Sequence, residues 1–308
     1  MCYSSQIRAD YRKYVRLFGA DMSIKEFFHT FWERVQGNSD IKIPKAMEAA
    51  FDHPQTEDER QVKELIDKFR ADQTVKFEQE LFAQRKRLAD AERALQVKAT
   101  KAASESQRIA TSKVAQLRTR LEDLKRTELL DRDSRIFPGV YAPVMVMQEG
   151  KKVILPMRYG CRPQGKPAFY DTKYPGTYNA RRDNLEGFWK GQFGHTHGVL
   201  LVTRFYENVD RDGKNVVLEF NPDNGEDMLV ACLWSRWTGP KGEELLSFAA
   251  ITDEPPPEVA AAGHDRCIIP LRPENVDAWL NPDPKNLKAS YAVLDDKERP
   301  YYEHRLAA

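Results

Sequence analysis

Cysteine is scarce in this chain, and its four cysteines lie far apart. Cys2, Cys161, Cys232 and Cys267 form no CxxC pair, so their spacing predicts neither a metal site nor a dithiol redox motif. The sequence has no apolar run long enough to cross a bilayer. Its N-terminus has no basic stretch followed by an apolar one, as a secretory signal would. We therefore expect a cytoplasmic protein with reduced thiols, no cofactor, no metal and no membrane partner.

An excess of charge of one sign is also absent. The 308 residues include 48 Lys and Arg against 47 Asp and Glu, which gives a net charge of +1. This balance excludes a protein that binds nucleic acid over its whole surface, so any such binding must come from a local basic patch. With 41% hydrophobic residues, the chain is long enough to bury a real core.

Glycine and proline are missing from residues 56–131, and their absence favours helix. The segment from Thr56 to Glu59 resembles a capping box, which marks a helix start. One helix of this length would measure roughly 110 Å at 1.5 Å per residue, so we expect a hairpin that folds back near residues 99–106. A coiled-coil pattern supports the hairpin, and its apolar positions are Leu81, Leu88, Leu95, Val114, Leu117, Leu121 and Leu124.

Residues 136–308 hold most of the glycines, prolines and β-branched runs. Turn signals such as Gln148-Glu149-Gly150 and Asn224-Gly225 separate these runs. Strands with a few helices among them indicate an α+β fold and not a repeated βαβ unit. The expected strands are 144–147, 153–157, 199–205, 216–220, 228–233, 246–251 and 267–271. Short helices are expected at 11–18, 23–32, 44–51, 255–262 and 273–280.

Cys2 is a candidate nucleophile, because a small second residue permits removal of Met1. The new N-terminus then carries an amine and a thiol on adjacent carbons. The amine can form a Schiff base with an aldehyde, and the thiol can close a five-membered thiazolidine ring. A free α-amine has a pKa of roughly 8, so a useful fraction is neutral near pH 7. The alternative is an incidental cysteine near a terminus.

Five further segments give Cys2 a context, since in order and spacing they resemble the SRAP family (SOS-response-associated peptidase). The resemblance covers residues 1–18 and about 136–305, and it is most specific from 229 to 282. It divides the chain into an SRAP-like catalytic domain, 1–20 and 136–308, and a helical insertion, 21–135, with its coiled-coil hairpin at about 56–131. The five segments are Tyr178-Asn179-Ala180-Arg181, residues 203–208, Ala231-Cys232-Leu233-Trp234, residues 251–254 and residues 263–271.

The resemblance implies both a fold and a function. The fold is α+β: antiparallel β-sheets form an open barrel with flanking helices, to which the coiled-coil arm is added. Members of the family recognise abasic sites in single-stranded DNA and form a thiazolidine crosslink through the N-terminal cysteine, as part of the response to DNA damage. The family motifs place Asn179, Glu207 and His264 around Cys2. A bacterial cytoplasmic location, with the nucleoid when bound to DNA, goes with this function.

Each of these three residues has a chemical role and a plainer alternative. Glu207, at the end of an apolar strand, could shuttle the proton that opens the closed abasic sugar; otherwise it is a surface carboxylate. His264 can relay protons near neutral pH; otherwise it binds helix carbonyls after Gly263. Asn179 can hold the Cys2 amine or a sugar oxygen; otherwise it stabilises a turn.

The expected DNA contacts rest on the same motifs. Arg181 corresponds to the best phosphate contact and Arg182 lies beside it, although both could form surface salt bridges. In place of the two family tryptophans, Tyr159 and Arg162 are taken to stack on bases. The chain departs from the family pattern at other positions: Tyr3 and Ser4 stand where the family has Gly-Arg, Asp183 replaces a Glu, and Glu186 replaces an Arg.

Two weaker signals lie outside the motifs. His195 and His197 alternate along a strand, but without a third ligand we interpret them as structural. Residues 85–126 carry twelve Lys and Arg against five Asp and Glu. Such an arm could add phosphate contacts, or it is a solvated helical face. The coiled coil could also bind a protein partner or self-associate.

Two other functions are compatible with the sequence. The first is a cysteine peptidase or amidase with an N-terminal nucleophile and autoproteolytic processing, which would also need an oxyanion hole and a peptide groove. The second is a non-catalytic interaction protein built on the coiled coil. That function would leave Asn179, Glu207 and His264 without a purpose.

Overall fold

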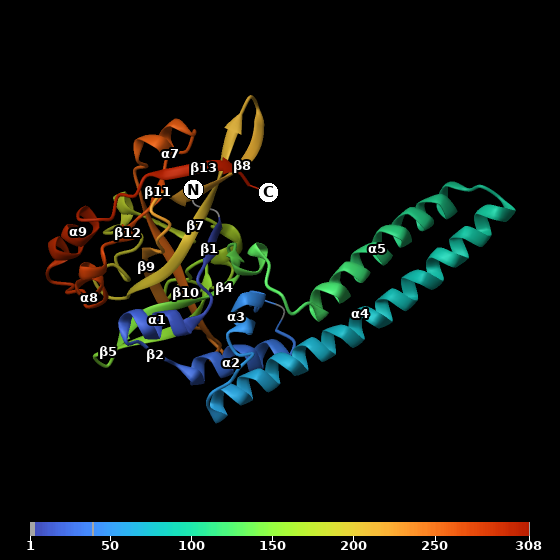
Figure 1. Cartoon of the computed structure of the whole chain (residues 1–308), viewed down its shortest axis with the longest axis horizontal. Helices are drawn as coiled ribbons and strands as arrows, with labels where there is room; N and C mark the ends of the chain where they lie inside the picture. Colours follow the sequence, from blue (N-terminus) through green and yellow to red (C-terminus); the bar gives the residue numbers. More distant parts are fainter. Residues whose placement is uncertain (1–3, 39, 308) are drawn as a thin grey trace.

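A five-stranded barrel forms the centre of the molecule in the computed structural model, which describes residues 4–38 and 40–307 (Figure 1). The strands follow the order β9-β10-β5-β4-β7, and β7 pairs again with β9, which closes the ring. Four contacts are antiparallel, and the β5–β10 contact is parallel. The bounds are β4 (Tyr141–Gln148), β5 (Lys151–Tyr159), β7 (His197–Arg211), β9 (Met228–Thr238) and β10 (Glu244–Asp253).

This architecture confirms the predicted fold class, an α+β barrel with flanking helices and a coiled-coil arm. Two details differ from the expected open, antiparallel barrel and correct it. The barrel is closed, because six residue pairs from His197↔Leu233 to Val202↔Met228 join β7 to β9. The β5–β10 pairing is parallel and involves Ser247↔Arg158 and Phe248↔Tyr159.

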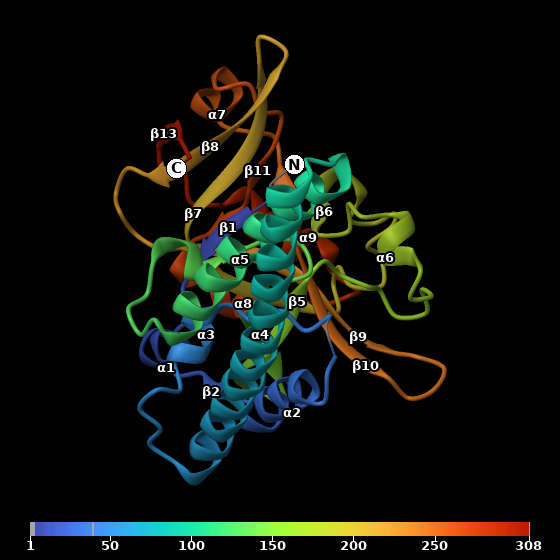
Figure 2. The same ribbon diagram turned by 90° about the vertical axis from the view of Figure 1, so that its right-hand side faces the viewer.

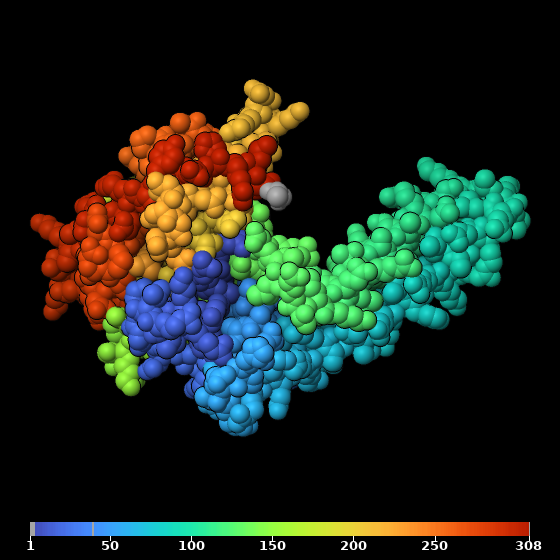
Figure 3. All heavy atoms as spheres, in the orientation of Figure 1, coloured from blue at the N-terminus to red at the C-terminus, as the bar shows by residue number. Residues whose placement is uncertain are grey.

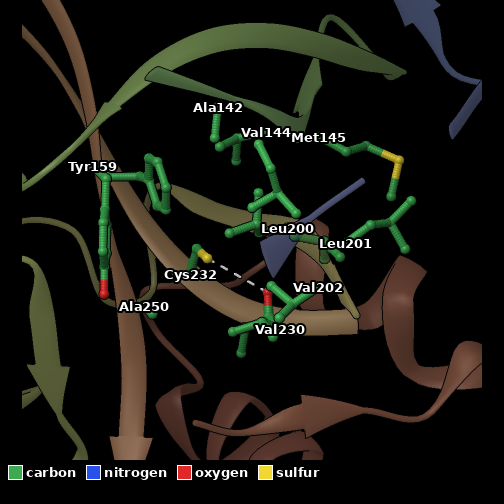
Figure 4. Close-up of a cluster of buried hydrophobic side chains, with 14 of the residues drawn as sticks. Ala142, Val144, Met145, Tyr159, Leu200, Leu201, Val202, Val230, Cys232 and Ala250 are labelled. Carbon is green, nitrogen blue, oxygen red and sulfur yellow. Dashed lines mark hydrogen bonds between the residues drawn. The ribbon is translucent and has the colours of Figure 1, made fainter. Parts of the chain in front are cut away.

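All five barrel strands contribute side chains to the interior (Figure 4). Cys232 lies among them, and its thiol donates a 3.4 Å hydrogen bond to the carbonyl of Val230. Burial raises the pKa of the Cys232 and Cys267 thiols, and it raises that of Cys161 to about 12. The three thiols are therefore buried and unreactive. The side chains labelled in Figure 4 are Ala142, Val144, Met145, Tyr159, Leu200, Leu201, Val202, Val230, Cys232 and Ala250.

Further strands pair with the barrel strands and extend the sheet. β1 (Ser4–Ile7) lies antiparallel to β7 and to β3 (Arg135–Ile136). β8 (Lys214–Pro222) joins β7 to β13 (Tyr302–Leu306). The remaining strands are β2 (Asp21–Met22), which pairs with β5, β6 (Asn179–Arg181) and β11 (Cys267–Ile268), which pair with β10, and β12 (Pro270–Leu271), which pairs with β9.

Every predicted strand overlaps an observed one, but residues 267–271 form two strands separated at Ile269. Helix α1 (Tyr11–Phe18) ends at Gly19, whose φ of +60° allows the chain to leave the helix. The other helices are α2 (Ile24–Val35), α3 (Lys45–Ala49), α6 (Tyr170–Lys173), α7 (Pro257–Ala261), α8 (Val276–Leu280) and α9 (Leu287–Asp295), with 3-10 turns η1 (Asp131–Ser134), η2 (Arg182–Asn184) and η3 (Pro273–Asn275).

The predicted hairpin is formed by α4 (Glu57–Val97) and α5 (Lys101–Lys125), which lie side by side and project from the barrel (Figures 1 and 2). The Thr56 hydroxyl caps α4 by accepting a hydrogen bond from the N–H of Glu59. The chain reverses at residues 98–100, at the start of the expected stretch. At 1.5 Å per residue, α4 is about 60 Å long. No helix among the described residues could span a membrane.

A buried charge cluster fixes the base of this arm to the barrel side. The carboxylate of Glu48 accepts from Arg34 at 2.6 Å and pairs with Arg70 on α4 at 2.8 Å. The Arg34 guanidinium also lies 4.0 Å from the ring centroid of Phe69 on α4. Charge pairs of this kind have strict geometry, so they set the direction in which α4 leaves the body.

Candidate functional site

Glu207 and His264 meet in the interior although they are far apart in sequence. Glu207 lies on β7 with a fully buried side chain, and its Oε2 is 3.1 Å from Nε2 of His264. A lone buried carboxylate is costly, so a hydrogen-bonding partner stabilises it. The structure thus brings two of the predicted residues together. It places both inside the protein, which excludes a surface carboxylate for Glu207.

The turn after α7 determines the position of the His264 ring. Gly263 has a φ of +99° and donates its N–H to the carbonyl of Ala260, while the N–H of His264 reaches Val259. The Nδ1 of His264 lies 2.9 Å from the carbonyl oxygen of Arg266. A proton on Nδ1 would donate to that carbonyl and leave Nε2 directed at Glu207. Burial lowers the pKa of His264, so its neutral form prevails near pH 7.

If Nδ1 donates to Arg266, a hydrogen bond between Oε2 of Glu207 and Nε2 of His264 needs one proton between these two atoms. It resides either on Oε2 and is donated to Nε2, or on Nε2 in an imidazolium–carboxylate pair. Both forms have the same net charge, so the proton can move between the two atoms without a change in the charge of the cavity. A buried pair of this type can give a proton to a substrate and take one back.

The third predicted residue, Asn179, is the first residue of β6 and is 5% exposed. β6 runs parallel to β10 with Asn179 opposite Ala250, and β10 also pairs with β11 just after the His264 turn. Asn179 also borders a shallow cavity that opens to the surface. The predicted nucleophile, Cys2, lies outside the described residues.

The start of β1 points to the same region. Ser4 lies opposite Tyr206, the neighbour of Glu207 on β7. The Ser4 hydroxyl accepts hydrogen bonds of 3.2 and 3.0 Å from Arg135, whose guanidinium also covers the Tyr206 ring at 3.6 Å. A cation therefore lies beside position 4, where the family pattern has an Arg that this chain lacks. The sequence motifs did not indicate Arg135, because it precedes the segments that carry the resemblance.

Of the four predicted DNA contacts, Arg181 is the most exposed. Its exposed side chain borders the cavity next to Asn179 and pairs with Asp183 at 2.6 Å. Such exposed pairs are weak, so a phosphate could replace Asp183. Arg182 instead lines a second cavity, where it pairs with Asp253 at 3.0 Å and Asp295 at 2.5 Å.

The stacking role expected of Tyr159 and Arg162 does not fit their surroundings. Tyr159 is 2% exposed, and its ring stacks on Phe248 with centroids 5.2 Å apart and meets the edge of Tyr178. Arg162 bonds to Asp171 and covers the ring of Trp237 at 4.3 Å. Both side chains are packed against other protein groups, so neither presents a flat face to a base.

A different group of aromatic rings lies beside Asn179. Tyr170 stacks on Phe188 with centroids 6.1 Å apart and planes 15° apart, and it also contacts Tyr174. Lys166 lies 5.3 Å from the centroid of Tyr170. These rings line a cavity of about 440 Å³ that also includes Asn179 and Arg181. The sequence signal was present as aromatic residues interspersed with lysines, but its position depends on the fold.

The two histidines interpreted as structural differ in their surroundings. His197 is buried, its Nε2 accepts from the N–H of Gly194 at 2.9 Å, and its Nδ1 lies 2.9 Å from the carbonyl of Trp279. Burial lowers its pKa to about 3. Both ring nitrogens are thus occupied by backbone groups, which supports the structural interpretation. His195 is exposed.

Comparison with known protein families identifies the family to which this chain belongs. The sequence profile of the SRAP family, SOS response associated peptidase, matches residues 100–305. This chain belongs to the SRAP family. Membership supports a function associated with the response to DNA damage. The match begins near the start of α5 and so includes part of the arm. The division into a catalytic domain, 1–20 and 136–308, and an insertion, 21–135, remains a proposal.

Solved structures give weaker similarities. A protein from Bordetella bronchiseptica aligns at 18% identity and a TM-score of 0.48 over 59% of this chain and 90% of that one. A protein from Bacteroides thetaiotaomicron aligns at 14% identity and a TM-score of 0.49, over 58% of this chain and 80% of that one. A phage-related protein from Bordetella bronchiseptica aligns at 18% identity and a TM-score of 0.44, over 60% of this chain and 85% of that one. No curated protein matches the sequence.

Proposed function

We propose that this SRAP protein senses abasic sites in single-stranded DNA and bonds to them covalently through Cys2, once Met1 has been removed. The observation that carries the proposal is the buried Glu207–His264 pair beside the start of β1. Two peptide units of about 3.8 Å each separate Cys2 from Ser4, so their Cα atoms lie within about 7.6 Å of each other. The covalent chain therefore keeps the nucleophile near the proton-transfer pair.

The proposed reaction is balanced and involves no change of redox state. The sugar hydroxyl loses its proton, the ring C–O bond breaks and the ring oxygen gains a proton, which leaves an open aldehyde. The Cys2 amine adds to this carbon, and loss of one water gives the imine. The thiol sulfur then bonds to the same carbon, and the thiol proton ends on nitrogen. Glu207 and His264 supply and accept the protons, and Asn179 holds the amine or a sugar oxygen.

The pH dependence of crosslinking follows from two titrations. Protonation of the α-amine lowers the rate about tenfold per pH unit below about pH 8. Burial lowers the pKa of His264, so a second proton enters the pair only below the ordinary histidine value of about 6.5. There the pair loses its proton acceptor, and the wild-type slope should rise from about one to about two.

Initial crosslinking rates from about pH 5 to about pH 8 test this expectation. His264→Ala should react more slowly and keep a slope of about one throughout. The result against it would be a wild-type slope that steepens above about pH 6.5, or a variant with the same second titration. Circular dichroism at each pH establishes that the proteins are folded.

The aromatic cavity provides a place for a base next to the abasic site. Tyr174 is 44% exposed there, and Arg181 at the same cavity can hold the adjacent phosphate. Stacking on an aromatic ring is worth about 1–3 kcal/mol per base.

Tyr174→Ala should therefore weaken binding to single-stranded DNA by about 5- to 150-fold. Tyr301→Ala is the matched control, because Tyr301 is 57% exposed but lines the other cavity. Fluorescence anisotropy with an undamaged oligonucleotide measures both affinities. Equal losses of affinity in the two variants would show that this cavity is not part of the DNA-binding surface.

One experiment tests the proposed function as a whole. The purified protein is incubated with a single-stranded oligonucleotide that has one abasic site, and a heat-resistant crosslink is expected on a denaturing gel. The same oligonucleotide with its aldehyde reduced to an alcohol should give no crosslink. If neither DNA reacts but a peptide or acyl-ester substrate is cleaved, the protein is a peptidase with an N-terminal nucleophile instead.

A further inference from the structure

The register of the two helices divides the arm into two halves. A 2.9 Å hydrogen bond from Arg87 on α4 to the hydroxyl of Ser106 joins the helices in the outer part of the hairpin. The Arg120 guanidinium covers the ring of Phe77 at 5.5 Å in the inner part. We call residues 81–112, which include the reversal of the chain, the tip half. Residues 57–80 and 113–126 form the base half, next to the barrel.

The two halves differ in charge. The base half has ten Lys and Arg against ten Asp and Glu, and is therefore neutral. The tip half has seven Lys and Arg against three Asp and Glu, a net charge of +4 in a chain of net charge +1, so the other 276 residues sum to −3. The tip half is therefore a local basic region of the kind that attracts DNA.

Most cations of the tip half have no carboxylate partner among the described residues. Arg93 pairs with Asp90 and Arg108 with Glu105, both at 2.6 Å. These pairs use two of the three carboxylates and leave only Glu92. The other five cations are exposed, and they are Arg85, Lys86, Arg87, Lys98 and Lys101. A net positive charge that no neighbouring carboxylate neutralises is available to phosphate groups.

The base half has equal numbers of cations and carboxylates, and three of its cations on α4 have a carboxylate partner on the same helix. Arg60 pairs with Glu57 at 2.6 Å, and Lys68 pairs with Asp72 at 3.1 Å. Lys63 also pairs with the carboxylate of Asp67, one turn further along the helix. These three cations lie on the same helix, α4, as Arg85, Lys86 and Arg87 of the tip half. They therefore provide a matched control within one arm.

An exposed aromatic ring accompanies the cations of the tip half. Phe82 on α4 is 74% exposed, although phenylalanine side chains are usually buried. Arg85 and Lys86 follow it by three and four residues, so all three side chains lie on neighbouring parts of the helix surface. A flat ring beside two cations is the combination that binds single-stranded nucleic acid, since a base stacks on the ring while the cations hold the backbone.

We propose that the tip half of the arm binds the sugar–phosphate backbone of single-stranded DNA that continues from the abasic site. Phe82 stacks on one base, and the five exposed cations contact phosphates around it. The tip half is about 24 Å long at 1.5 Å per residue, so a strand that lies along it places several phosphates within reach of the cations.

The shape of the molecule is compatible with a DNA strand bound along the tip half. The outer part of the arm stands away from the barrel, and open space lies between the two (Figure 3). A strand held at the reactive site can cross this space and reach the tip half. The buried charge cluster of Glu48, Arg34 and Arg70 holds the arm in this direction. This inference rests on the proposed function for its ligand, but not on the covalent step.

The test compares two triple variants of the full chain with equal loss of charge. Arg85→Gln/Lys86→Gln/Lys98→Gln removes cations of the tip half, and Arg60→Gln/Lys63→Gln/Lys68→Gln removes paired cations of the base half. Affinity for an undamaged, labelled single-stranded oligonucleotide is measured over a range of salt concentrations. Each phosphate contact contributes about 0.7 to the slope of log affinity against log salt, so the tip variant should lose about two units. The base variant should keep nearly the whole slope.

In affinity, a slope difference of about two is a factor of about 16 between roughly 50 and 200 mM salt. Equal slopes for wild type and the tip variant, or equal losses in the two variants, would overturn the proposal. So would a tip variant that changes self-association in sedimentation but leaves DNA binding intact.

The single variant Phe82→Ala tests the stacking contact separately. It should lower the affinity for the same oligonucleotide by about fivefold or more and keep the wild-type salt slope, because the ring has no charge. Val75→Ala is the control, because Val75 is 54% exposed on the base half of α4. Equal affinities for wild type and Phe82→Ala would exclude Phe82 from the DNA-binding surface.

Because these tests use undamaged DNA, their failure is distinct from failure of the proposed function. If salt slopes differ as expected but no protein crosslinks to an abasic site, the arm binds DNA and the covalent chemistry is wrong. If all proteins crosslink with unchanged salt slopes, the covalent chemistry stands and the arm proposal is wrong. Helix content and melting temperature show whether each variant is folded.

Discussion

Replacing Cys2 with alanine is expected to abolish the heat-resistant crosslink to an abasic site. The variant retains an α-amine, so it can still form a Schiff base, but it has no thiol to close the thiazolidine ring. A reductant added during the reaction should therefore trap Cys2→Ala on the DNA, whereas without reductant the imine hydrolyses. This difference separates loss of ring closure from loss of DNA binding.

Cys161→Ala is the control for Cys2→Ala. Burial raises the pKa of Cys161 to about 12, so its thiolate is scarce at pH 7 and its loss should leave the crosslink yield unchanged. A preparation that retains Met1 should be unreactive, because its amine is no longer adjacent to the thiol. Equal yields from wild type and Cys2→Ala without reductant would rule out Cys2 as the reactive residue.

Glu207→Gln should slow crosslinking on the order of 100-fold or more, the usual contribution of a positioned acid or base. The amide keeps the shape of the side chain but cannot transfer the proton that it shares with His264. Glu219→Gln is the matched control, because Glu219 is also a buried carboxylate and lies opposite Tyr206 on the neighbouring strand β8. Its partners are Arg204 and Arg305, at 3.1 and 2.9 Å. It should lose stability but react at nearly the wild-type rate.

A second substrate distinguishes a chemical role of Glu207 from a structural one. DNA with a permanently open aldehyde in place of the abasic sugar needs no ring opening. Glu207→Gln should regain much of the lost rate with this substrate, whereas a distorted site would remain slow with both. Single-turnover rates with the two oligonucleotides provide the measurement. If the deficits are equal, Glu207 does not act in ring opening.

Much of the fold could be predicted because the signals are local. The absence of glycine and proline, together with the heptad repeat, predicted the hairpin of α4 and α5, and apolar runs between turn signals predicted the barrel strands. β6 (Asn179–Arg181) was missed as a strand because three residues carry too little pattern. Closure of the barrel depends on the pairing of β7 with β9, which no local signal indicates.

For the candidate site too, the sequence indicated some features, and others became visible only in the fold. The resemblance identified Glu207 and His264, but their 3.1 Å contact joins positions 57 residues apart and required the fold. Tyr159 was expected to stack on a base in place of a family tryptophan. The parallel pairing of β5 and β10 places it on Phe248 instead. Arg182 is held by Asp253, which is 71 residues away, so the sequence could not distinguish it from the exposed Arg181.

The mass of the N-terminal peptide after crosslinking tests the central claim most directly. Wild-type protein is reacted with abasic single-stranded DNA, treated with nuclease and iodoacetamide, and digested with trypsin. The proposed chemistry predicts the sugar-phosphate remnant on the peptide from Cys2 to Arg8, less one water, with the Cys2 sulfur protected from alkylation. A remnant on a lysine, or a crosslinked peptide whose Cys2 thiol still alkylates, would contradict it.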